Sequence, residues 1–378
     1  MSIDSPIEIK VAKPARMEEL LCATVDRDAS DLHLTAGMPP VFRMRGELTV
    51  MNCDAYGPEE IETLVNEILT TRHKEVLRTK KSVDFAISAT EVGRFRVAVY
   101  HQRGALSVAL RLLAKGIPSF GRLGLPESVN RLSGLRDGLV LVTGVTGSGK
   151  STTLATVIDD INAKHRRHII TIEDPIEYIH QNNRCIINQR ELHTDVPSFS
   201  DALRDSLRAD PDVILVGEMR DLETMRTAIM AAETGHLVFS TLHSRDCVST
   251  VNRLVGAFPA GEQAQIRQQL SSTLVAVVSQ RLLPTAGGSG RVPAVEVMFS
   301  TPGISNLIRQ GKDDMIYSAI ETGAKLGMQT MEQSLLGLVE KGRIGLETGV
   351  DAARNGTLLR QRFSRSRAVG SATGGVKG

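Results

Sequence analysis

Apolar and polar positions repeat in one way over the first third of the chain and in another way beyond it. Residues 31–35 alternate apolar and polar side chains, as half-buried strands do. Over 57–79 the apolar residues recur at helical spacing, which predicts one helix, and 17–26 predicts another. Further alternating, strand-like runs cover 41–45, 83–88, 94–102 and 106–113. The first part of the chain is therefore expected to be α+β.

Beyond residue 126, short apolar runs alternate with segments of helical spacing. The runs at 139–142, 213–216 and 237–241 predict strands, and the longest helical segment is expected over 262–280. Alternation of this kind is typical of a largely parallel sheet with helices on both faces. The fold class expected for this part is α/β.

The length of 378 residues fits two domains rather than one core. The changes in pattern place a flexible leader at 1–15 and an α+β domain at 16–113. A linker rich in Gly and Pro follows at 114–126, and an α/β domain ending in short helices covers 127–363. Residues 364–378 are rich in Gly, Ser and Arg, so a disordered tail is expected there.

Composition excludes some classes of protein and leaves others. The net charge of +2 and an aromatic content of 3% give no reason to expect nucleic acid as a partner. No apolar run is long enough to span a bilayer, and the first residues do not resemble a signal peptide. The four cysteines are far apart in the sequence, so free thiols and a cytoplasmic location are expected.

A phosphate-binding pattern, Gly-Val-Thr-Gly-Ser-Gly-Lys-Ser, follows the predicted strand 139–142 and precedes a helical segment. Glycines let the backbone N–H groups turn toward phosphate oxygens, while the lysine supplies a mobile positive charge. The serine after it can place its hydroxyl on Mg²⁺. The sequence thus predicts an ATP site, with Mg²⁺ as cofactor, whose contacts are Gly144, Thr146, Gly147, Ser148, Gly149, Lys150, Ser151 and Thr152.

Two acidic segments follow predicted strands. Glu173, Asp174 and Glu177 come after the strand that ends near residue 172, and Pro175 stops that strand. Glu218 follows the run 213–216, where an ordinary Walker B motif has an aspartate. Since parallel strands present their carboxyl ends at one edge, these acids are expected near the phosphates. Glu218 is predicted to hold the metal with Ser151 or to polarise water; the residues alone do not decide between Glu173 and Glu177 as base.

Two histidines flank the predicted strand 237–241. His236 and His243 invite a metal interpretation, but a strand separates them by roughly 20 Å at about 3.3 Å per residue, too far to share an ion. One of them is expected to contact the γ-phosphate, and the other to be structural.

Arginines gather in the N-terminal domain. Arg94 and Arg96 share one face of a predicted strand, with Arg103 and Arg111 nearby. Without matching acids in these runs, such a face is expected to meet an anion, such as a phosphate.

The order of these motifs resembles the secretion ATPases of type II secretion and type IV pilus systems, within them the PilT-like retraction ATPases. The segments Ser30–Gly46 and Gly93–Arg96 are similar to that family's PAS-like N-terminal domain. The resemblance implies a RecA-like P-loop NTPase core and a homohexamer with ATP between subunits. It also implies Glu177 as the residue that activates water, His236 and His243 as the His-box pair, and arginines near 94–111 close to the nucleotide.

The function implied is an ATP-hydrolysing motor for type IV pilus retraction and twitching motility. Such a motor is peripheral to the cytoplasmic face of the inner membrane, and a pilus platform protein there is its partner. Ser305 stands where the family's C-terminal signature has arginine, so a PilU-like accessory motor or another paralogue remains an alternative. Alternatives of other classes are a nucleic-acid-dependent RecA-like ATPase and a scaffold that binds ATP without hydrolysing it.

Overall fold

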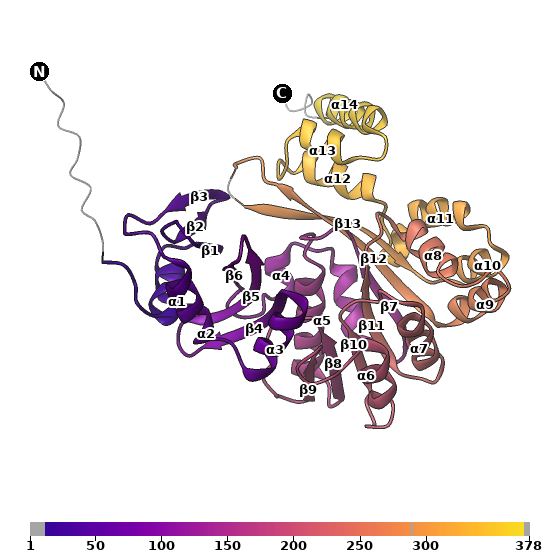
Figure 1. Ribbon diagram of the computed structural model, residues 1–378. Coiled ribbons are helices and arrows are strands. Elements are labelled where there is room, and N and C mark those ends of the chain that lie inside the picture. The colour runs from indigo at the N-terminus through magenta and orange to yellow at the C-terminus, as the bar shows by residue number, and fades with distance from the viewer. Residues whose placement is uncertain (1–11, 289, 374–378) are drawn as a thin grey trace, which may run out of the picture. The chain divides into compact units, whose positions relative to one another are not determined.

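The chain forms two compact units (Figure 1). The computed structural model describes residues 12–288 and 290–373. Unit 1 runs to Gly116 and includes Pro175–Tyr178, whereas unit 2 consists of Ile117–Asp174 and the chain from Ile179 onward. The unit boundary falls inside the predicted linker 114–126, which also contains the short helix α4, Phe120–Leu123. Most of the predicted leader 1–15 lies outside the described residues.

Unit 1 is built on a six-stranded antiparallel sheet with the strand order β3-β2-β1-β6-β5-β4. One face of this sheet packs against helices around a core that includes Leu32, Phe95 and Leu110. The alternating runs predicted from the sequence are all strands. The strands are β1 Asp31–Thr35, β2 Val41–Met44, β3 Glu47–Val50, β4 Ser82–Ala89, β5 Gly93–Gln102 and β6 Ala105–Leu112.

The helical segment 57–79 is two helices, not the single helix that its periodicity predicts. The structure has α2, Pro58–Asn66, and α3, Thr71–Lys80, after α1, Met17–Asp26. Thr70 ends the continuity because its side chain accepts a hydrogen bond from the His73 amide and so caps a new helix. Apolar spacing alone does not show such a break, because both helices face the same core.

Unit 2 is built on a seven-stranded sheet, in which β7 lies between β12 and β11. From β12 to β9, each pair of neighbouring strands in this sheet is parallel. The pair of β12 and β13 is antiparallel. The central strands β7, β10 and β11 are completely buried, as expected for a sheet covered on both faces. The strands are β7 Gly138–Thr143, β8 His168–Glu173, β9 Ile186–Glu191, β10 Val213–Val216, β11 Leu237–Leu242, β12 Leu274–Pro284 and β13 Arg291–Phe299.

Helices of unit 2 follow the strands in the predicted alternation. After the 3-10 segment Glu127–Gly134, they are α5 Lys150–Lys164, α6 Phe199–Ser206, α7 Leu222–Glu233, α8 Cys247–Gly256, α9 Gln263–Thr273, α10 Pro302–Gln310, α11 Ile316–Thr322, α12 Met331–Glu340, α13 Leu346–Ala352 and α14 Gly356–Thr373. The last three share a small core that includes Leu335, Val339 and Leu359.

Two segments of unit 2 differ from the sequence-based expectation. The predicted helix 262–280 ends at Thr273, and the chain continues as β12, because the run from Leu274 to Val278 is rich in β-branched residues that favour a strand. At the C-terminus, α14 reaches Thr373, although composition predicts disorder from residue 364. Residues 374–378 lie outside the described part of the chain.

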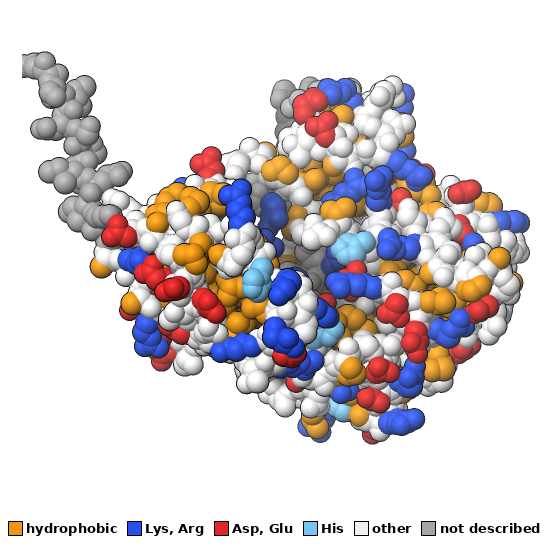
Figure 2. Space-filling view, viewed as in Figure 1, with side chains coloured by type: hydrophobic (Ala, Val, Ile, Leu, Met, Phe, Trp, Pro, Cys, Tyr) orange, Lys and Arg blue, Asp and Glu red, His pale blue; other side chains and the backbone are white. Residues whose placement is uncertain are grey.

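The surface of unit 2 mixes charges of both signs. Figure 2 shows basic and acidic side chains interspersed over the face in view, in keeping with the near-neutral net charge. Among the described residues, no helix is both long and apolar enough to cross a bilayer.

Candidate functional site

The phosphate-binding pattern forms the turn between β7 and α5, as its sequence predicts. Gly144 and Gly149 have φ angles of 144° and 89°, values that other residues rarely adopt. A Cβ on Gly144 would lie 2.3 Å from the main-chain oxygen of Gln280, and one on Gly149 would lie 2.8 Å from the side-chain nitrogen of Gln280. Glycine is therefore required at Gly144, because the main chain of β12 passes directly behind the loop, and the positive φ favours glycine at Gly149.

The side chains of this loop are arranged to meet a ligand. Lys150 is nearly buried, and its Nζ donates hydrogen bonds to the main-chain oxygens of Gly144, at 3.0 Å, and Val145, at 3.1 Å. The hydroxyl of Ser148 is buried without a hydrogen-bond partner. Buried polar groups are nearly always paired, so this hydroxyl fits a loop that closes around a polar group. Ser151 is exposed at the N-terminus of α5, where a helix favours anions.

The register of the sheet aligns the strand ends beside this loop. Val216 pairs with Ile172 on one side and with Ser240 on the other, and Ser240 pairs with Leu141. Residues that follow these positions therefore leave the sheet at the same edge. Since β7 and β10 are separated by one strand, their ends lie about 10 Å apart, a span that a nucleotide triphosphate can bridge.

Predicted site residues at this edge form a connected charged network. Glu218 accepts from Arg220 Nε at 2.8 Å, and its other oxygen lies 3.2 Å from His243 Nε2. Arg220 also reaches Asp174, at 3.3 Å. The structure thus brings Asp174, Glu218 and His243 together, as the sequence predicts.

Glu173 lies at the end of β8, and its carboxylate is held by neighbours in the sheet. Its Oε1 accepts from the Thr171 hydroxyl at 2.6 Å and from the side chain of Gln189, on β9, at 3.1 Å. Glu177 lies in the four residues that pack with unit 1. Its part as the base therefore stays a prediction from the resemblance.

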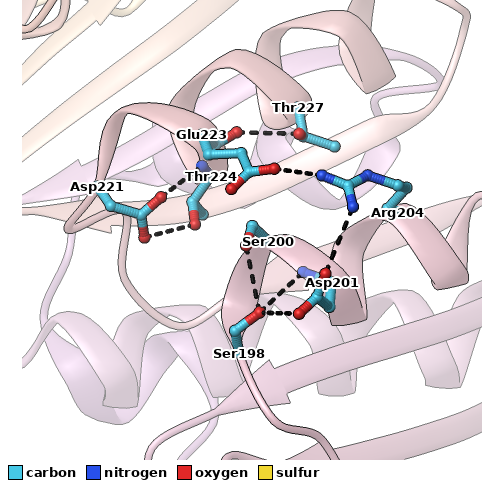
Figure 3. A network of polar contacts seen from close by, with 8 residues as sticks. All are labelled: Ser198, Ser200, Asp201, Arg204, Asp221, Glu223, Thr224 and Thr227. Atoms are coloured by element: carbon cyan, nitrogen blue, oxygen red, sulfur yellow. Dashed lines mark hydrogen bonds and ion pairs between the residues drawn. The ribbon is translucent and has the colours of Figure 1, made fainter.

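A second polar network fixes the start of the helix that follows Glu218 (Figure 3). Asp221 caps α7 by accepting from the Thr224 amide and hydroxyl, both at 2.8 Å. On α6, Arg204 bonds to Asp201 and to Glu223 of α7, which joins the last turn of α6 to the first turn of α7. The segment between β10 and α7 is thus short and fixed at its far end.

His236 lies away from this edge. It directly precedes β11, at the opposite end from His243, and its Nδ1 lies 3.0 Å from the main-chain oxygen of Ala231 and 3.2 Å from Thr234 Oγ1. Within unit 2, only His243 of the two histidines lies at the edge with the phosphate-binding loop. Within its own subunit His236 thus lies at the far end of β11 from the phosphate-binding loop, and which of the two histidines contacts nucleotide stays a prediction.

The arginines of unit 1 do not form one cluster. Arg103 lies at the tip of the turn between β5 and β6, whereas Arg94 lies at the other end of β5 and bonds to the main-chain oxygen of Ile176 at 2.9 Å. Arg96 and Arg111 are cross-strand neighbours. Arg111 has an acidic partner on a neighbouring strand: its Nε donates to Asp31 of β1 at 2.8 Å.

Sequence reasoning missed three residues that hold the site. Arg220 joins two acidic segments, Gln189 supports Glu173, and Gln280 lies behind the phosphate-binding loop and accepts from Thr153 at 2.9 Å. The signal for Gln280 is its place at the end of a β-branched apolar run, which was interpreted as helix. Within the described residues, no group of three or more His, Cys, Asp or Glu side chains is arranged to hold a metal.

Comparison with known proteins decides the family. Residues 125–334 match the family described as Type II/IV secretion system protein. The chain is 46% identical to the type IV pilus retraction ATPase PilT of Pseudomonas aeruginosa, over 89% of this chain and 97% of that protein. The chain belongs to the type II/IV secretion system family.

Other relatives and solved structures agree with this assignment. This chain is 39% identical to the type IV pilus ATPase PilU of Pseudomonas aeruginosa, over 91% of this chain and 90% of that protein. A crystal structure of the pilus retraction motor PilT with bound ADP superimposes with a TM-score of 0.84 and 44% identity, over 94% and 100% of the two chains. The ATPase DotB of Legionella pneumophila superimposes with a TM-score of 0.79 and 27% identity, over 90% and 98%. The predicted resemblance and the predicted fold, a RecA-like core with an N-terminal domain, are confirmed.

Proposed function

We propose that this secretion-system protein is an ATP-hydrolysing hexameric motor that powers type IV pilus retraction and twitching motility. The observation that carries the proposal is the sheet edge of unit 2, where a glycine-rich phosphate-binding loop and the Glu218 network lie side by side. The similarity to PilT, a retraction ATPase, connects this edge with pilus retraction.

The residues of the loop fit a nucleotide. Main-chain amides between Gly144 and Gly149 bind the phosphates, and Lys150 moves its charge from main-chain oxygens to the β- and γ-phosphates. Ser151 and Glu218 are the residues proposed to hold Mg²⁺, which when bound neutralises phosphate charge. His243 Nε2 lies 3.2 Å from Glu218 and so is placed to orient its carboxylate.

Hydrolysis requires a carboxylate that orients water toward the γ-phosphate. The resemblance gives this part to Glu177, and it assigns arginines of unit 1, among them Arg94, Arg96, Arg103 and Arg111, to the nucleotide of the hexamer. Loss of the γ-phosphate then releases contacts that hold the units in place, as in other phosphate-held switches. The cycle thereby converts hydrolysis into movement of a pilus platform protein at the cytoplasmic face of the inner membrane.

The accessory alternative rests on Ser305, which lies on α10 with its Oγ 3.1 Å from Ser300 Oγ. Identity to PilU is lower than to PilT, so retraction is the function proposed first.

One experiment separates the proposal from the other classes. The ATPase rate of the purified full chain is measured with and without single-stranded DNA and RNA, alongside the mass of the assembly by light scattering. We expect hydrolysis by a hexamer-sized assembly, unchanged by nucleic acid. Stimulation by nucleic acid, or binding of ATP without turnover, contradicts the motor. Deletion of the gene then tests the direction: retained pili and lost surface motility support retraction.

A further inference from the structure

A buried carboxylate joins two helices of unit 2 outside the network described above. Glu296 lies on β13 and is only 1% exposed. Its Oε1 accepts from the Cys247 amide at 2.8 Å, and its Oε2 accepts from the Met331 amide at 3.3 Å. Cys247 is the first residue of α8, and Met331 is the first residue of α12. One side chain therefore binds the first amide of each helix.

These two amides are not served by the ordinary caps. Asp246 caps α8 by accepting from the Ser249 amide, and Thr330 caps α12 by accepting from the Gln333 amide. The first amide of a helix has no partner inside the helix, so an acceptor from elsewhere is needed when it is buried. Glu296 supplies both acceptors and places its negative charge at the positive ends of both helices.

Strand β12, which pairs with β13 beside Glu296, also bonds to the turn that precedes α8. Ser279 of β12 is the cross-strand partner of Glu296, and its hydroxyl donates to the main-chain oxygen of Arg245 at 3.0 Å. Arg253 donates to the main-chain oxygen of His243 at 2.8 Å. The turn from His243 to Cys247 is therefore fixed at its start, its middle and its end.

We propose that Glu296 is a positioning residue, which holds His243 against Glu218 and joins this turn to the C-terminal helices. The inference rests on the proposed function, because it assigns Glu296 a part in ATP turnover. Movement at the start of α12 is transmitted through the two carboxylate oxygens to the start of α8, four residues after His243. Turnover is expected to depend on Glu296 through the position of His243. Nucleotide binding is not, because the described residues of the phosphate-binding loop form no hydrogen bond with this carboxylate.

Glu296→Gln tests the proposal with little change in shape. The amide has one acceptor oxygen, so one of the two helix amides loses its partner. We expect kcat to fall by roughly 10- to 100-fold, because displacing a catalytic group by about 1 Å can cost about 100-fold in rate, with KM for ATP and the affinity for ADP unchanged. Amide hydrogen exchange is expected to become faster at the starts of both α8 and α12.

Glu332→Gln is the matched control. Glu332 is a buried carboxylate of α12 that also accepts two hydrogen bonds, from the Tyr317 hydroxyl at 2.8 Å and the Arg354 amide at 3.0 Å. All these partners belong to the C-terminal helical region, so this variant should speed exchange there. Since Glu296 still accepts from both helix starts in this variant, exchange at the start of α8 and kcat should change much less than in Glu296→Gln. An equal fall of kcat in both variants would show general loosening and overturn the proposal.

Ser279→Ala is a milder variant if Glu296→Gln does not fold. It removes only the bond to Arg245, so exchange should rise in the turn after His243, and kcat should fall by a smaller factor. Unchanged kcat in a folded Glu296 or Ser279 variant, or unchanged exchange at either helix start in Glu296→Gln, overturns the proposal. Amide hydrogen exchange can be measured without ATP turnover. If the wild-type protein does not hydrolyse ATP, the proposed function is contradicted, and exchange at the starts of α8 and α12 still tests whether Glu296 joins the two helices.

Discussion

The two sheets of this protein place charged side chains differently. In unit 2 the central strands are buried throughout, and charge begins only where a strand ends, as at Glu218 and His243. In unit 1 charged residues lie within the strands, where Arg43, Asp31 and Arg111 form one row across β2, β1 and β6. A parallel sheet covered on both faces thus concentrates charge at an edge, whereas an antiparallel sheet with one free face spreads it over a surface.

This difference predicts where substitutions are costly. At the edge of unit 2 a few side chains converge on one ligand, so losing one should affect activity far more than stability. In the row of Arg43, Asp31 and Arg111 in unit 1, each charge has a local partner, so losing one should affect mainly stability. The predictions below test this contrast from the largest effect to the smallest.

Lys150→Ala should abolish ATP hydrolysis, with a fall of at least about 100-fold, and should weaken nucleotide binding. The lysine supplies the mobile charge of the loop, and no other described lysine lies within it. The measurement is steady-state ATPase with ADP binding by calorimetry. Lys164→Ala is the control, because Lys164 lies at the other end of α5 in an exposed pair with Asp160. More than about a tenth of the wild-type rate in both Lys150→Ala and Glu218→Ala would contradict the site assignment.

Glu218→Gln should also reduce kcat by roughly 100-fold but should leave ADP binding nearly unchanged. The amide keeps the shape of the side chain and loses the charge that faces Arg220 and His243. The comparison is with Glu223→Gln, five residues later on α7, whose carboxylate pairs with Arg204 at the surface. Equal losses in the two variants would show that charge anywhere in this region matters, and not charge at the sheet edge.

His180 should make the stability of unit 2 depend on mildly acidic pH. Burial lowers the pKa of His180 to about 4, and its Nδ1 has no hydrogen-bond partner. Between pH 6.5 and about 4 the unfolded chain takes up a proton that the folded chain does not, so stability falls with pH by at most about 3 kcal/mol. Above pH 6.5 the group has no such effect.

His180→Gln should therefore reduce the difference in unfolding temperature between pH 7 and pH 5, measured by circular dichroism. If this difference is the same in the variant and the wild type, another group is responsible for the acid sensitivity.

Asp31→Asn should destabilise unit 1 by about 1–3 kcal/mol at neutral pH, because it leaves Arg43 and Arg111, on the strands either side of β1, without the shared acid. Burial acts to raise the pKa of Asp31, but hydrogen bonds from Arg111 and Ser30 outweigh it and the pKa is lowered. The stabilisation is thus present above the pKa of an ordinary aspartate and is lost as pH falls through the lower folded value.

Arg111→Ala should have the smaller effect on stability of these two substitutions. Its side chain is 67% exposed, so its removal should cost less than about 1 kcal/mol. Urea unfolding measures both variants, and a larger effect for Arg111 than for Asp31 would reverse the order that burial predicts.

Much of the fold follows from apolar patterning, because most strands and helices are amphipathic or completely buried. The errors come from places where two elements share one pattern. Thr70 splits a helix without interrupting the apolar spacing, and Leu274 begins a strand directly after a helix. The sequence does not predict β9, because four of its six side chains are polar, and one of them, Gln189, serves as a partner for Glu173 of β8.

The site could be predicted as far as its main-chain turn and strand ends, since those follow from local sequence. Contacts between distant segments could not. The sequence favours a pair between Arg220 and the adjacent Asp221, but the register of β8 and β10 brings Asp174 near Arg220, and Asp221 caps α7 instead. Asp31 lies on β1 and Arg111 on β6, with four strands between them in the sequence, but β1 and β6 are neighbours in the sheet.

The position of β7 as the third strand of the seven-stranded order, away from both edges, has a consequence for how the protein unfolds. Its backbone bonds to β11 and β12 are flanked by further strands on both sides, so they open only when most of the sheet does. A protease that nicks the peripheral α14 first would leave a fragment in which the nucleotide cradle keeps the full resistance of the intact domain.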